Sequence, residues 1–229
     1  MGHISGWAWV GQGPPTLHLA TQETFSFNVL QHGFMNFLLL IAWPKAGNSG
    51  FSAIPTLSAR GSARRSCCPT IVSRSQWGAR SPKSRTPLKT PVPLVIIHHT
   101  EGNLCSSLAS CSKEVKGIQN YHLDKRGWAD IGYNFLIGED GRVYEGRGWR
   151  TMGSHARKVN RISLGFSFLG NRAPNAAALN AAKKLIQCAI SRGYLSRSYT
   201  LKGHRNVMPT SCPGNALYAI IRMWPRFKA

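Results

Sequence analysis

The sequence predicts a mixed α/β fold for residues 67–229. Short apolar runs of strand length and longer segments with apolar side chains at helical spacing both occur in this part of the chain. The length of 229 residues and the hydrophobic content of 42% suit one well-filled domain plus a tail. Residues 1–66 contain scattered Gly, Pro and Ser without a sustained period, so we expect them to form an extension and not a domain.

The first strand and the first helix follow a proline-rich approach. Residues 94–97 are a continuous apolar run that ends at His98, which indicates a buried strand. Residues 112–123 carry apolar side chains at helical spacing, and Ser112 with the nearby Glu114 marks the expected helix start. A strand followed by a helix is therefore predicted.

A hairpin and a further strand come next. Residues 134–137 and 142–144 flank the turn 138–141, whose Asp-Gly step supplies the positive φ that a tight hairpin requires. Residues 163–169 have the apolar character of another buried strand. We therefore expect two antiparallel strands and then a third strand.

Two helices are expected in the last third of the chain. Residues 176–192 are rich in Ala and end at Gly193, a common residue just past a helix C-terminus. Residues 216–224 suggest a last helix. Strands and helices together place the chain in the mixed α/β class.

The extension contains one strongly apolar run, residues 34–43. Its length is about half of the roughly 20 residues that a helix needs to span a bilayer, so no transmembrane anchor is expected. The run has the length of a signal-peptide core, although it lies far from Met1 and lacks a basic flank just before it. A translation start at Met35 would remove the first of these defects.

The charge of the chain points to anionic partners. Twenty-nine Lys and Arg against eight Asp and Glu give a formal charge of +21, and no acidic residue follows Glu145. Nucleic acid, membranes and bacterial wall polymers are all anionic, and a solvated basic face is the simpler interpretation. Because no helix-turn-helix, zinc finger or base-stacking strand is recognisable, nucleic-acid binding is not expected.

The cysteines favour an oxidising compartment. None of the six stands in a CxxC pair of the kind that builds a structural zinc knuckle. A secreted domain with disulfides fits this usage better. The six are Cys67, Cys68, Cys105, Cys111, Cys188 and Cys212.

One set of side chains could hold a metal ion. Zinc hydrolases usually bind the ion through three side chains drawn from His, Cys and carboxylates and leave the fourth position to water. His98 ends the apolar strand, while His204 and Cys212 lie eight residues apart in a late loop that could bring both to one ion. By spacing alone, a histidine at a strand end is more often a hydrogen-bonded core or surface residue.

Several motifs, in the same order, resemble those of animal peptidoglycan recognition proteins. The resemblance extends over residues 67–229 and is absent from 1–66. This family in turn is similar to the bacteriophage lysozyme amidases. The motifs are VIIHHT at 95–100, GWADIGYNFLIG at 127–138, VYEGRGW at 143–149, GSHA at 153–156, LKGHR at 201–205 and CPG at 212–214.

The resemblance implies a fold and a chemistry. It implies a central mixed β-sheet flanked by helices, with a groove for peptidoglycan. In the amidase members, the positions of His98, His204 and Cys212 bind Zn²⁺, whereas many members that bind without cutting carry Ser at the position of Cys212. The chain therefore resembles the zinc-dependent N-acetylmuramoyl-L-alanine amidases of innate antibacterial defence.

The resemblance also assigns roles around the metal. Tyr133 matches a tyrosine that donates a hydrogen bond to the developing oxyanion or orients the water, with a buried core aromatic as the alternative. Thr210 matches a threonine of the animal amidases and would support catalysis, or be only a loop residue. Gly127, Trp128 and Arg147 together suggest stem peptides with meso-diaminopimelic acid, whose extra carboxylate Arg147 could bind.

Further positions match the groove or the disulfides of the family. Those that match groove contacts to sugar or peptide, and that could equally be structural, are His99, His122, His155 and Asn160. Cys105 and Cys111 match a short disulfide loop, and Cys188 is expected to pair with Cys67 or Cys68. Since Cys212 would be a metal ligand, one thiol of that tandem pair is left over, either free or linking two chains in a dimer.

Three functions from different classes remain open on the sequence. The first is the secreted zinc amidase that hydrolyses the bond between muramic acid and the stem peptide. The second is a peptidoglycan-binding recognition or bactericidal protein without catalysis, against which the intact Cys212 argues. The third is a cationic antimicrobial protein that acts through charge and is therefore strongly sensitive to salt.

Overall fold

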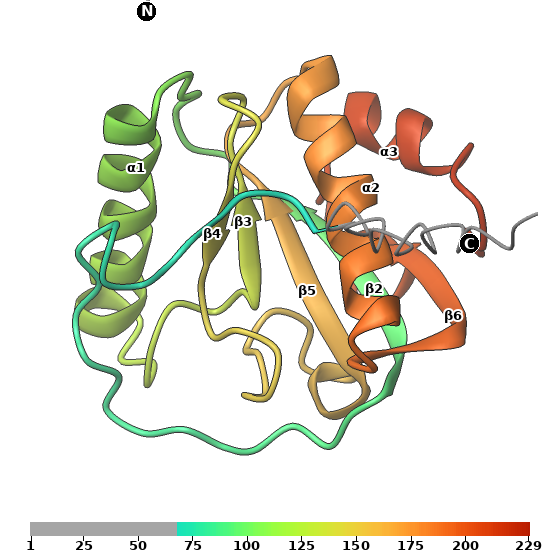
Figure 1. The fold of residues 1–229 in the computed structure, drawn as a ribbon, viewed down its shortest axis with the longest axis horizontal. Coiled ribbons are helices and arrows are strands. Elements are labelled where there is room, and N and C mark those ends of the chain that lie inside the picture. The colour runs from blue at the N-terminus through green and yellow to red at the C-terminus, as the bar shows by residue number, and fades with distance from the viewer. Residues whose placement is uncertain (1–67) are drawn as a thin grey trace, which may run out of the picture. The chain divides into compact units, whose positions relative to one another are not determined.

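The structure is a computed structural model that describes residues 68–229. It contains a six-stranded sheet in the order β1-β4-β3-β5-β2-β6 (Figure 1). The extension 1–66, its apolar run 34–43 and Cys67 lie outside the described residues. The strands are β1 (Ile71–Val72), β2 (Val92–His99), β3 (Phe135–Ile137), β4 (Val143–Glu145), β5 (Ser163–Phe168) and β6 (Leu195–Gly203).

Three α-helices and three short helical turns complete the fold. Helix α1 lies on one side of the sheet in Figure 1, and α2 and α3 lie on the other side. Within residues 68–229, no helix is long and apolar enough to cross a membrane. The α-helices are α1 (Leu108–Asn120), α2 (Ala176–Ser191) and α3 (Asn215–Ile221); the turns are the π-helical Tyr121–Lys125 and the 3₁₀ segments Asn160–Ile162 and His204–Asn206.

The sheet is mixed, as expected. β3 and β4 form the antiparallel hairpin around the 138–141 turn. The other neighbouring pairs are all parallel: β1 with β4, β3 with β5, β5 with β2, and β2 with β6. Because parallel strands end at the same edge, residues that follow the C-terminal ends of β2 and β6 meet there.

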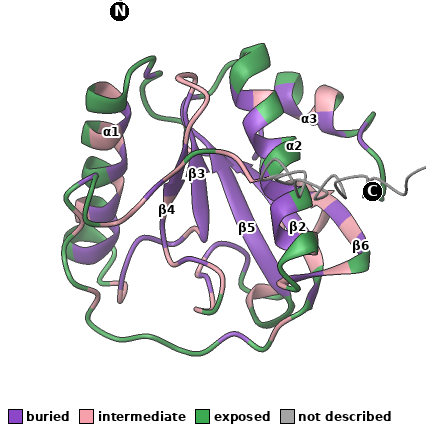
Figure 2. Ribbon diagram, in the orientation of Figure 1, coloured by how far each residue is buried: buried purple, intermediate pink, exposed green. Residues whose placement is uncertain are grey.

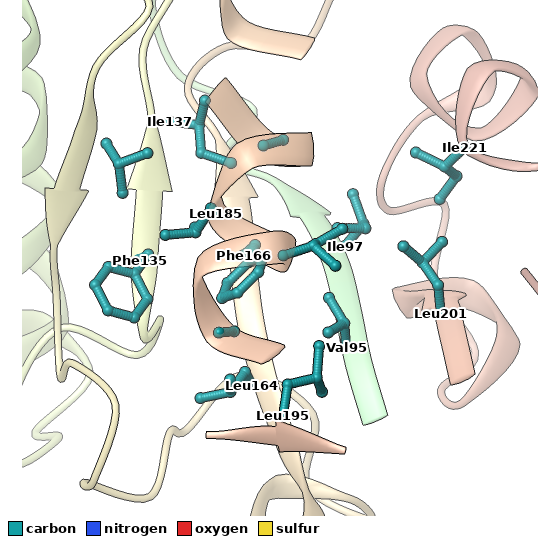
Figure 3. Packing of buried hydrophobic residues seen from close by; sticks show 14 of the residues in the cluster. Val95, Ile97, Phe135, Ile137, Leu164, Phe166, Leu185, Leu195, Leu201 and Ile221 are labelled. Carbon is teal, nitrogen blue, oxygen red and sulfur yellow. The ribbon is translucent and has the colours of Figure 1, made fainter. Parts of the chain in front are cut away.

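One face of the sheet packs against α2 and α3. Successive strand residues point to opposite faces, and Val95 and Ile97 of β2 lie in the same core cluster as Leu185 of α2 and Ile221 of α3 (Figure 3). β3 and β5 are buried along their whole length, whereas β6 at the edge is partly exposed (Figure 2). The larger hydrophobic core therefore lies on the side away from α1.

The opposite face is built differently. Here a smaller cluster joins Val115 of α1 to Leu136 and Tyr144 of the hairpin. In β5 the residues that alternate with the apolar core are all small: Ser163, Gly165 and Ser167. Small side chains leave space above this part of the sheet for rings from other segments.

The predicted start of the first helix, Ser112, is wrong. The helix begins at Leu108, because Ser107 caps it: its Oγ accepts a hydrogen bond from the Ser110 amide, and Ser110 Oγ accepts one from the Ser107 amide. Ser110 takes the place that Glu or Gln occupies in the usual capping box, so the sequence did not show the usual pattern for a helix start. After Asn120 the helix widens into the π-helical turn.

Two strands were not expected from the sequence. β1 has only two residues and cannot show a period. In β6 the buried residues Leu195, Tyr199 and Leu201 are interrupted by polar ones, and its pairing with β2 shifts register between Val92 and Leu94. Because of this irregularity and its exposed positions, β6 lacks the regular alternation by which a strand is predicted from sequence.

Two disulfides lie in the described part of the chain. Cys105 and Cys111 close the short loop at the start of α1. Cys68 pairs with Cys188 of α2 and so fastens the first described residues to that helix. Of the two partners considered for Cys188, the structure selects Cys68.

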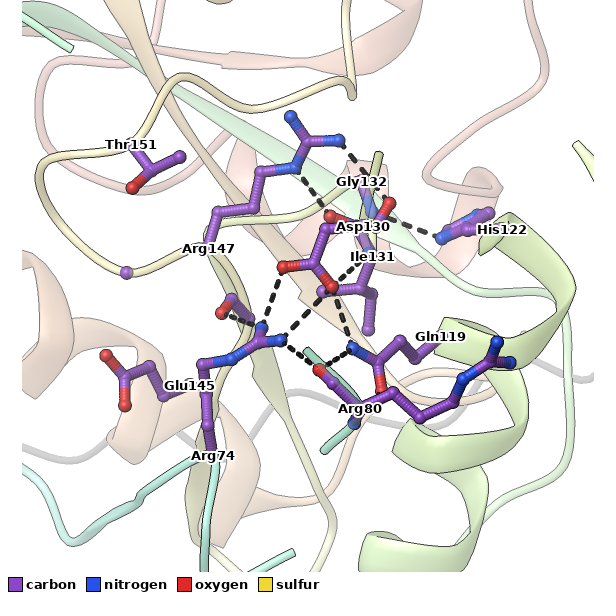
Figure 4. A network of polar contacts seen from close by, with 12 residues as sticks. Arg74, Arg80, Gln119, His122, Asp130, Ile131, Gly132, Glu145, Arg147 and Thr151 are labelled. Atoms are coloured by element: carbon purple, nitrogen blue, oxygen red, sulfur yellow. Dashed lines mark hydrogen bonds and ion pairs between the residues drawn. The ribbon is translucent and has the colours of Figure 1, made fainter. Parts of the chain in front are cut away.

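A buried carboxylate, Asp130, connects several segments on the side of α1 (Figure 4). Its Oδ2 lies 3.0 Å from Nη1 of Arg74. Its Oδ1 accepts hydrogen bonds from Gln119 Nε2 of α1 and from the Ile131 amide, both at 2.8 Å. Asp130 therefore holds the segment before β3 against α1.

Replacing Asp130 by Ala should lower the free energy of unfolding by about 1–3 kcal/mol, because the buried Gln119 amide and Ile131 amide would lose their acceptor and the partly buried Arg74 would lose its counter-charge. Denaturant unfolding measures the loss. The matched control is Asp124→Ala, which breaks the exposed pair with Arg80 and should change stability little. Equal losses in the two variants would contradict the role given to Asp130.

Candidate metal centre

The site is organised by the C-terminal ends of two parallel strands. Ile97 of β2 is paired with Gly203 of β6, so the next residues, His98 and His204, lie side by side at one edge of the sheet. His98 is 1% exposed and therefore held by the packing of the sheet. The expected late loop for His204 is a 3₁₀ turn that begins directly after β6.

Cys212 completes a cluster of three candidate ligands. The amide of Arg205 donates to the Cys212 carbonyl at 2.9 Å, which brings residue 212 back beside the end of β6. The ligand atoms of His98, His204 and Cys212 all lie within 4.8 Å of one another. Cys212 Sγ is 3.7 Å from Nδ1 of His98. The structure thus brings together the three residues that the sequence suggested.

Burial keeps the three groups neutral. It lowers the pKa of His98 well below its usual value, an effect that nearby His155 reinforces, and it lowers the pKa of His204. Burial raises the pKa of the Cys212 thiol to about 11, although a hydrogen bond from the backbone of His99 acts in the opposite direction. Two unprotonated imidazoles and a thiol that a cation would ionise form a donor set that suits Zn²⁺.

His155 contacts the ring nitrogen of His98 that does not face Cys212. Its Nδ1 is 3.0 Å from Nε2 of His98, and the two rings meet edge to face. Burial, with a smaller contribution from His204, lowers the pKa of His155 to about 3. Asn160 Oδ1 accepts hydrogen bonds from the amides of His155 and Ala156, so it holds this loop. Asn160 thus has a structural contact here.

Tyr133 stands beside the ligands. Its ring centroid is 5.4 Å from that of His98. Burial, then the nearby Cys212, raises its pKa to about 12, although the neighbouring Ser167 hydroxyl acts in the opposite direction. The phenol therefore remains protonated at neutral pH and can donate a hydrogen bond.

A cavity of about 230 Å³ opens in front of these groups. Thr210 lies in its wall, and Thr210 Oγ1 accepts a hydrogen bond from the Cys212 amide at 3.2 Å. Nε2 of His99 is 3.2 Å from a carboxylate oxygen of Glu101. The cavity is lined by His98, His99, Thr100, Glu101, Trp128, Tyr133, Ser154, His155, His204, Thr210 and Cys212.

The cleft continues along α1. A second cavity of about 340 Å³ shares Thr100 and Tyr133 with the first and includes His122 of the π-helical turn. The ring of His122 stacks on Trp128 with centroids 4.5 Å apart, and its Nδ1 accepts a hydrogen bond from the Gly132 amide. Burial, reinforced by Arg147, lowers the pKa of His122 to about 4. His122 and Trp128 therefore form a neutral aromatic wall between the two cavities.

Gly127 and Arg147 lie outside the lining of these two cavities. Gly127 is exposed, with a φ of +68° that suits glycine, in the turn before Trp128. Arg147 donates hydrogen bonds to the carbonyls of Ile131 and Met152 at 2.7 and 2.9 Å. Its side chain instead lines a separate cavity of about 220 Å³ (Figure 4 shows its surroundings). The structure shows Arg147 as a support for the segment that carries Trp128.

Three residues of the cavity lining were not singled out in the sequence: Thr100, Glu101 and Ser154. Each lies next to a motif that contains a histidine, and this proximity was the sequence feature that could have indicated a place in the cavity. Thr100 and Glu101 follow the end of β2, and Ser154 precedes His155. Their side-chain directions depend on the loop conformations, which the sequence pattern does not specify.

Comparisons with known proteins agree with this geometry. A family model described as N-acetylmuramoyl-L-alanine amidase matches residues 88–215. Peptidoglycan recognition protein 1 of Bos indicus is 50% identical over 165 residues, which are 70% of this chain and 87% of the relative. The matched region includes the candidate ligands and the cleft.

Solved structures show the same fold. Drosophila PGRP-LB has a TM-score of 0.68 and 44% identity, over 69% of this chain and 95% of its own. Peptidoglycan recognition protein-LE, solved with tracheal cytotoxin, a monomeric diaminopimelic acid-type peptidoglycan, has a TM-score of 0.68 and 41% identity, over 69% of this chain and 96% of its own. With an amidase family model that covers more than half of its length and relatives at this level of identity, the chain belongs to the peptidoglycan recognition protein family.

Proposed function

We propose that this protein is a zinc-dependent N-acetylmuramoyl-L-alanine amidase that binds bacterial peptidoglycan and hydrolyses the bond between muramic acid and the stem peptide. The observation that carries this proposal is the cluster of His98, His204 and Cys212, whose ligand atoms lie within 4.8 Å of one another. They face a cavity that leads into a longer cleft. A zinc hydrolase needs three such ligands and an open position for water.

The three ligands would hold Zn²⁺ at the edge of the sheet. When bound, the ion lowers the pKa of a water molecule toward neutrality and polarises the scissile carbonyl. The backbone N–H of His99, which donates to the Cys212 sulfur, stabilises the thiolate form that binding requires. The packed sheet keeps His98 in place and so limits the reorganisation that binding requires.

Tyr133 and Thr210 act on the substrate in this proposal. Addition of water to the amide carbon places negative charge on the carbonyl oxygen. As the C–N bond then breaks, the leaving amine takes up a proton that came from the added water. The Tyr133 phenol, kept protonated by its raised pKa, donates a hydrogen bond to that oxygen. Thr210 accepts from the Cys212 amide, so its own hydroxyl proton remains available to a substrate in the cavity.

The cleft along α1 would bind the polymer around the scissile bond. The stacked rings of His122 and Trp128 provide an apolar surface with few charges for a sugar or stem peptide. We propose a preference for stem peptides with meso-diaminopimelic acid, which the complex of the LE relative with a diaminopimelic acid-type ligand supports. Arg147 would act here through the segment that it supports.

We further propose that the protein is secreted and serves in innate antibacterial defence. Two disulfides are consistent with an oxidising compartment, and the family is defined by recognition of a bacterial wall polymer. A recognition protein that binds peptidoglycan without cutting it is the second candidate, since the cleft would serve both. The favoured function is the amidase because the Cys212 sulfur remains among the ligands.

The full chain should release free stem peptide from purified peptidoglycan when zinc is present. Cys212→Ser should reduce release by more than the ~100-fold that loss of an outer-shell partner can cost, because a direct ligand is removed. A chelator should have the same effect on the wild type, and chromatography of the released peptide measures it.

The matched control is Ser211→Ala, an exposed neighbour of the ligand that should leave release unchanged. Pull-down with insoluble peptidoglycan should show that Cys212→Ser still binds the polymer. Binding without release in every sample, including the zinc-loaded wild type, would make the protein a recognition protein. Strong salt sensitivity of binding that cleft variants do not alter would favour action through charge.

Zinc binding at pH 6.5 should release about one proton. The lowered pKa values of His98 and His204 make the imidazolium form of each the minor one at this pH, whereas the raised pKa of Cys212 keeps its thiol proton in place until the ion binds. Isothermal titration calorimetry in buffers with different ionisation enthalpies measures the number. Release of two or more protons would show that an imidazolium or the zinc-bound water also loses a proton, and release of none would show that the thiolate forms without the ion.

The wild-type enzyme should release stem peptide faster from diaminopimelic acid-type peptidoglycan than from the lysine type. The test compares initial rates on the two purified polymers at equal concentrations of stem peptide. Equal rates, or a faster rate on the lysine type, would contradict the proposed preference while leaving the amidase activity in place.

A further inference from the structure

A chain of hydrogen bonds leads from His98 into the protein interior. In the innermost hydrogen bond the donor is known, because the other partner is a backbone carbonyl, which can only accept. Ser163 Oγ lies 2.7 Å from the carbonyl oxygen of Val159, so the serine hydroxyl must donate its one proton to that carbonyl. Ser163 Oγ is also 3.4 Å from Nε2 of His155. Because its proton is already used, the hydroxyl accepts there, and His155 carries its proton on Nε2.

The direction of hydrogen-bond donation is also fixed between the rings of His155 and His98. A neutral imidazole has one N–H, so a proton on Nε2 leaves Nδ1 of His155 as an acceptor. That Nδ1 is 3.0 Å from Nε2 of His98, which must therefore carry the proton between them. His98 then has an unprotonated Nδ1, the atom that lies 3.7 Å from Cys212 Sγ. The chain of bonds selects the tautomer of His98 whose lone pair is directed at the cluster.

The ring of His155 is locked in the orientation that this chain needs. A Cβ at Gly153 or at Gly165 would lie 2.4 Å from a ring carbon of His155, so both glycines allow close contact with the ring. Asn160 holds the backbone of the same loop through the His155 amide. Gly165 and Ser163 both lie on the face of β5 that carries small residues. This one strand therefore provides the space for the His155 ring and the acceptor for its Nε2 proton.

We propose that Ser163 is a positioning residue which, through His155, fixes His98 in the tautomer with a free Nδ1 for the metal ion. The role toward the metal rests on the proposed zinc amidase function, whereas the tautomer is a property of the zinc-free protein. Ser163 touches neither the candidate ligands nor the cavity; it is fully buried at the start of β5.

Loss of the Ser163 hydroxyl would remove the preference for this tautomer of His98. Without an acceptor for its Nε2 proton, His155 gains nothing from that tautomer and can carry its proton on Nδ1 instead. It would then donate to Nε2 of His98, which would place the proton of His98 on Nδ1. That proton occupies the position of the metal bond, so zinc would bind only after the tautomers exchange.

Two substitutions of equal shape isolate the hydroxyl. Ser163→Thr and Ser163→Val add the same branched side chain to a buried strand position, so their packing costs are matched. They differ in one group, hydroxyl against methyl. Ser163→Ala, which adds no volume, is the third variant. Denaturant unfolding of each full-length variant confirms that it is folded before it is tested.

The first readout is the protonated nitrogen of His98 in zinc-free protein, from nitrogen chemical shifts of ¹⁵N-histidine-labelled full chain. Wild type and Ser163→Thr should carry the proton of His98 on Nε2. Ser163→Val and Ser163→Ala should show a mixture of tautomers or a proton on Nδ1. This measurement uses neither zinc nor peptidoglycan, so a protein without amidase activity would still give an answer.

The second readout is zinc affinity, from competition with a chromophoric chelator. Ser163→Val and Ser163→Ala should bind zinc about 10- to 100-fold more weakly than wild type, and Ser163→Thr should stay close to wild type. The proposal is overturned if Ser163→Val and Ser163→Ala keep the proton of His98 on Nε2 and the wild-type affinity. It is also overturned if Thr and Val have equal effects, because the hydroxyl would then be irrelevant.

Discussion

The parallel pairing of β2 and β6 is the constraint on which the candidate metal centre depends. His98 and His204 are more than a hundred residues apart in the chain. The pairing places them side by side at one edge of the sheet, because each comes directly at the end of its strand. Of the three candidate ligands, only Cys212 comes from a loop, and a hydrogen bond from the Arg205 amide to the Cys212 carbonyl holds that loop beside the end of β6. A site with two ligands on strand ends needs little reorganisation when an ion binds.

The two faces of the sheet divide structure from chemistry. On one face, large apolar side chains of β2, β3 and β5 pack against α2 and α3. On the other face, the small side chains of β5 leave room for the rings of His155 and Tyr133 beside His98. The period of two in a β-strand allows one short segment, Ser163–Phe168, to serve both purposes. Burial on this second face also keeps the imidazoles neutral, as metal binding requires.

The cleft walls depend on polar groups that do not face the cleft. Asp130 joins the segment before β3 to α1 and to Arg74, and Arg147 binds the backbone of the same segment. Trp128, which lies within this segment, is thereby held against His122. A change in Asp130 or Arg147 would alter ligand binding through the position of Trp128, without loss of a direct contact.

The sequence by itself determined the mixed α/β class, the positions of most strands and helices, and the family through motifs that lie close to the ligands. It also named the three candidate ligands, since their residue types and the resemblance sufficed. Only the tertiary structure decided that β6 exists, that Arg147 and Asn160 contact backbone groups, and that Cys68 is the partner of Cys188. The reason is that a motif records which side chains are present, whereas their partners depend on segments far away in the chain. Ser163 shows this most clearly, because only the packed sheet places its hydroxyl within reach of His155.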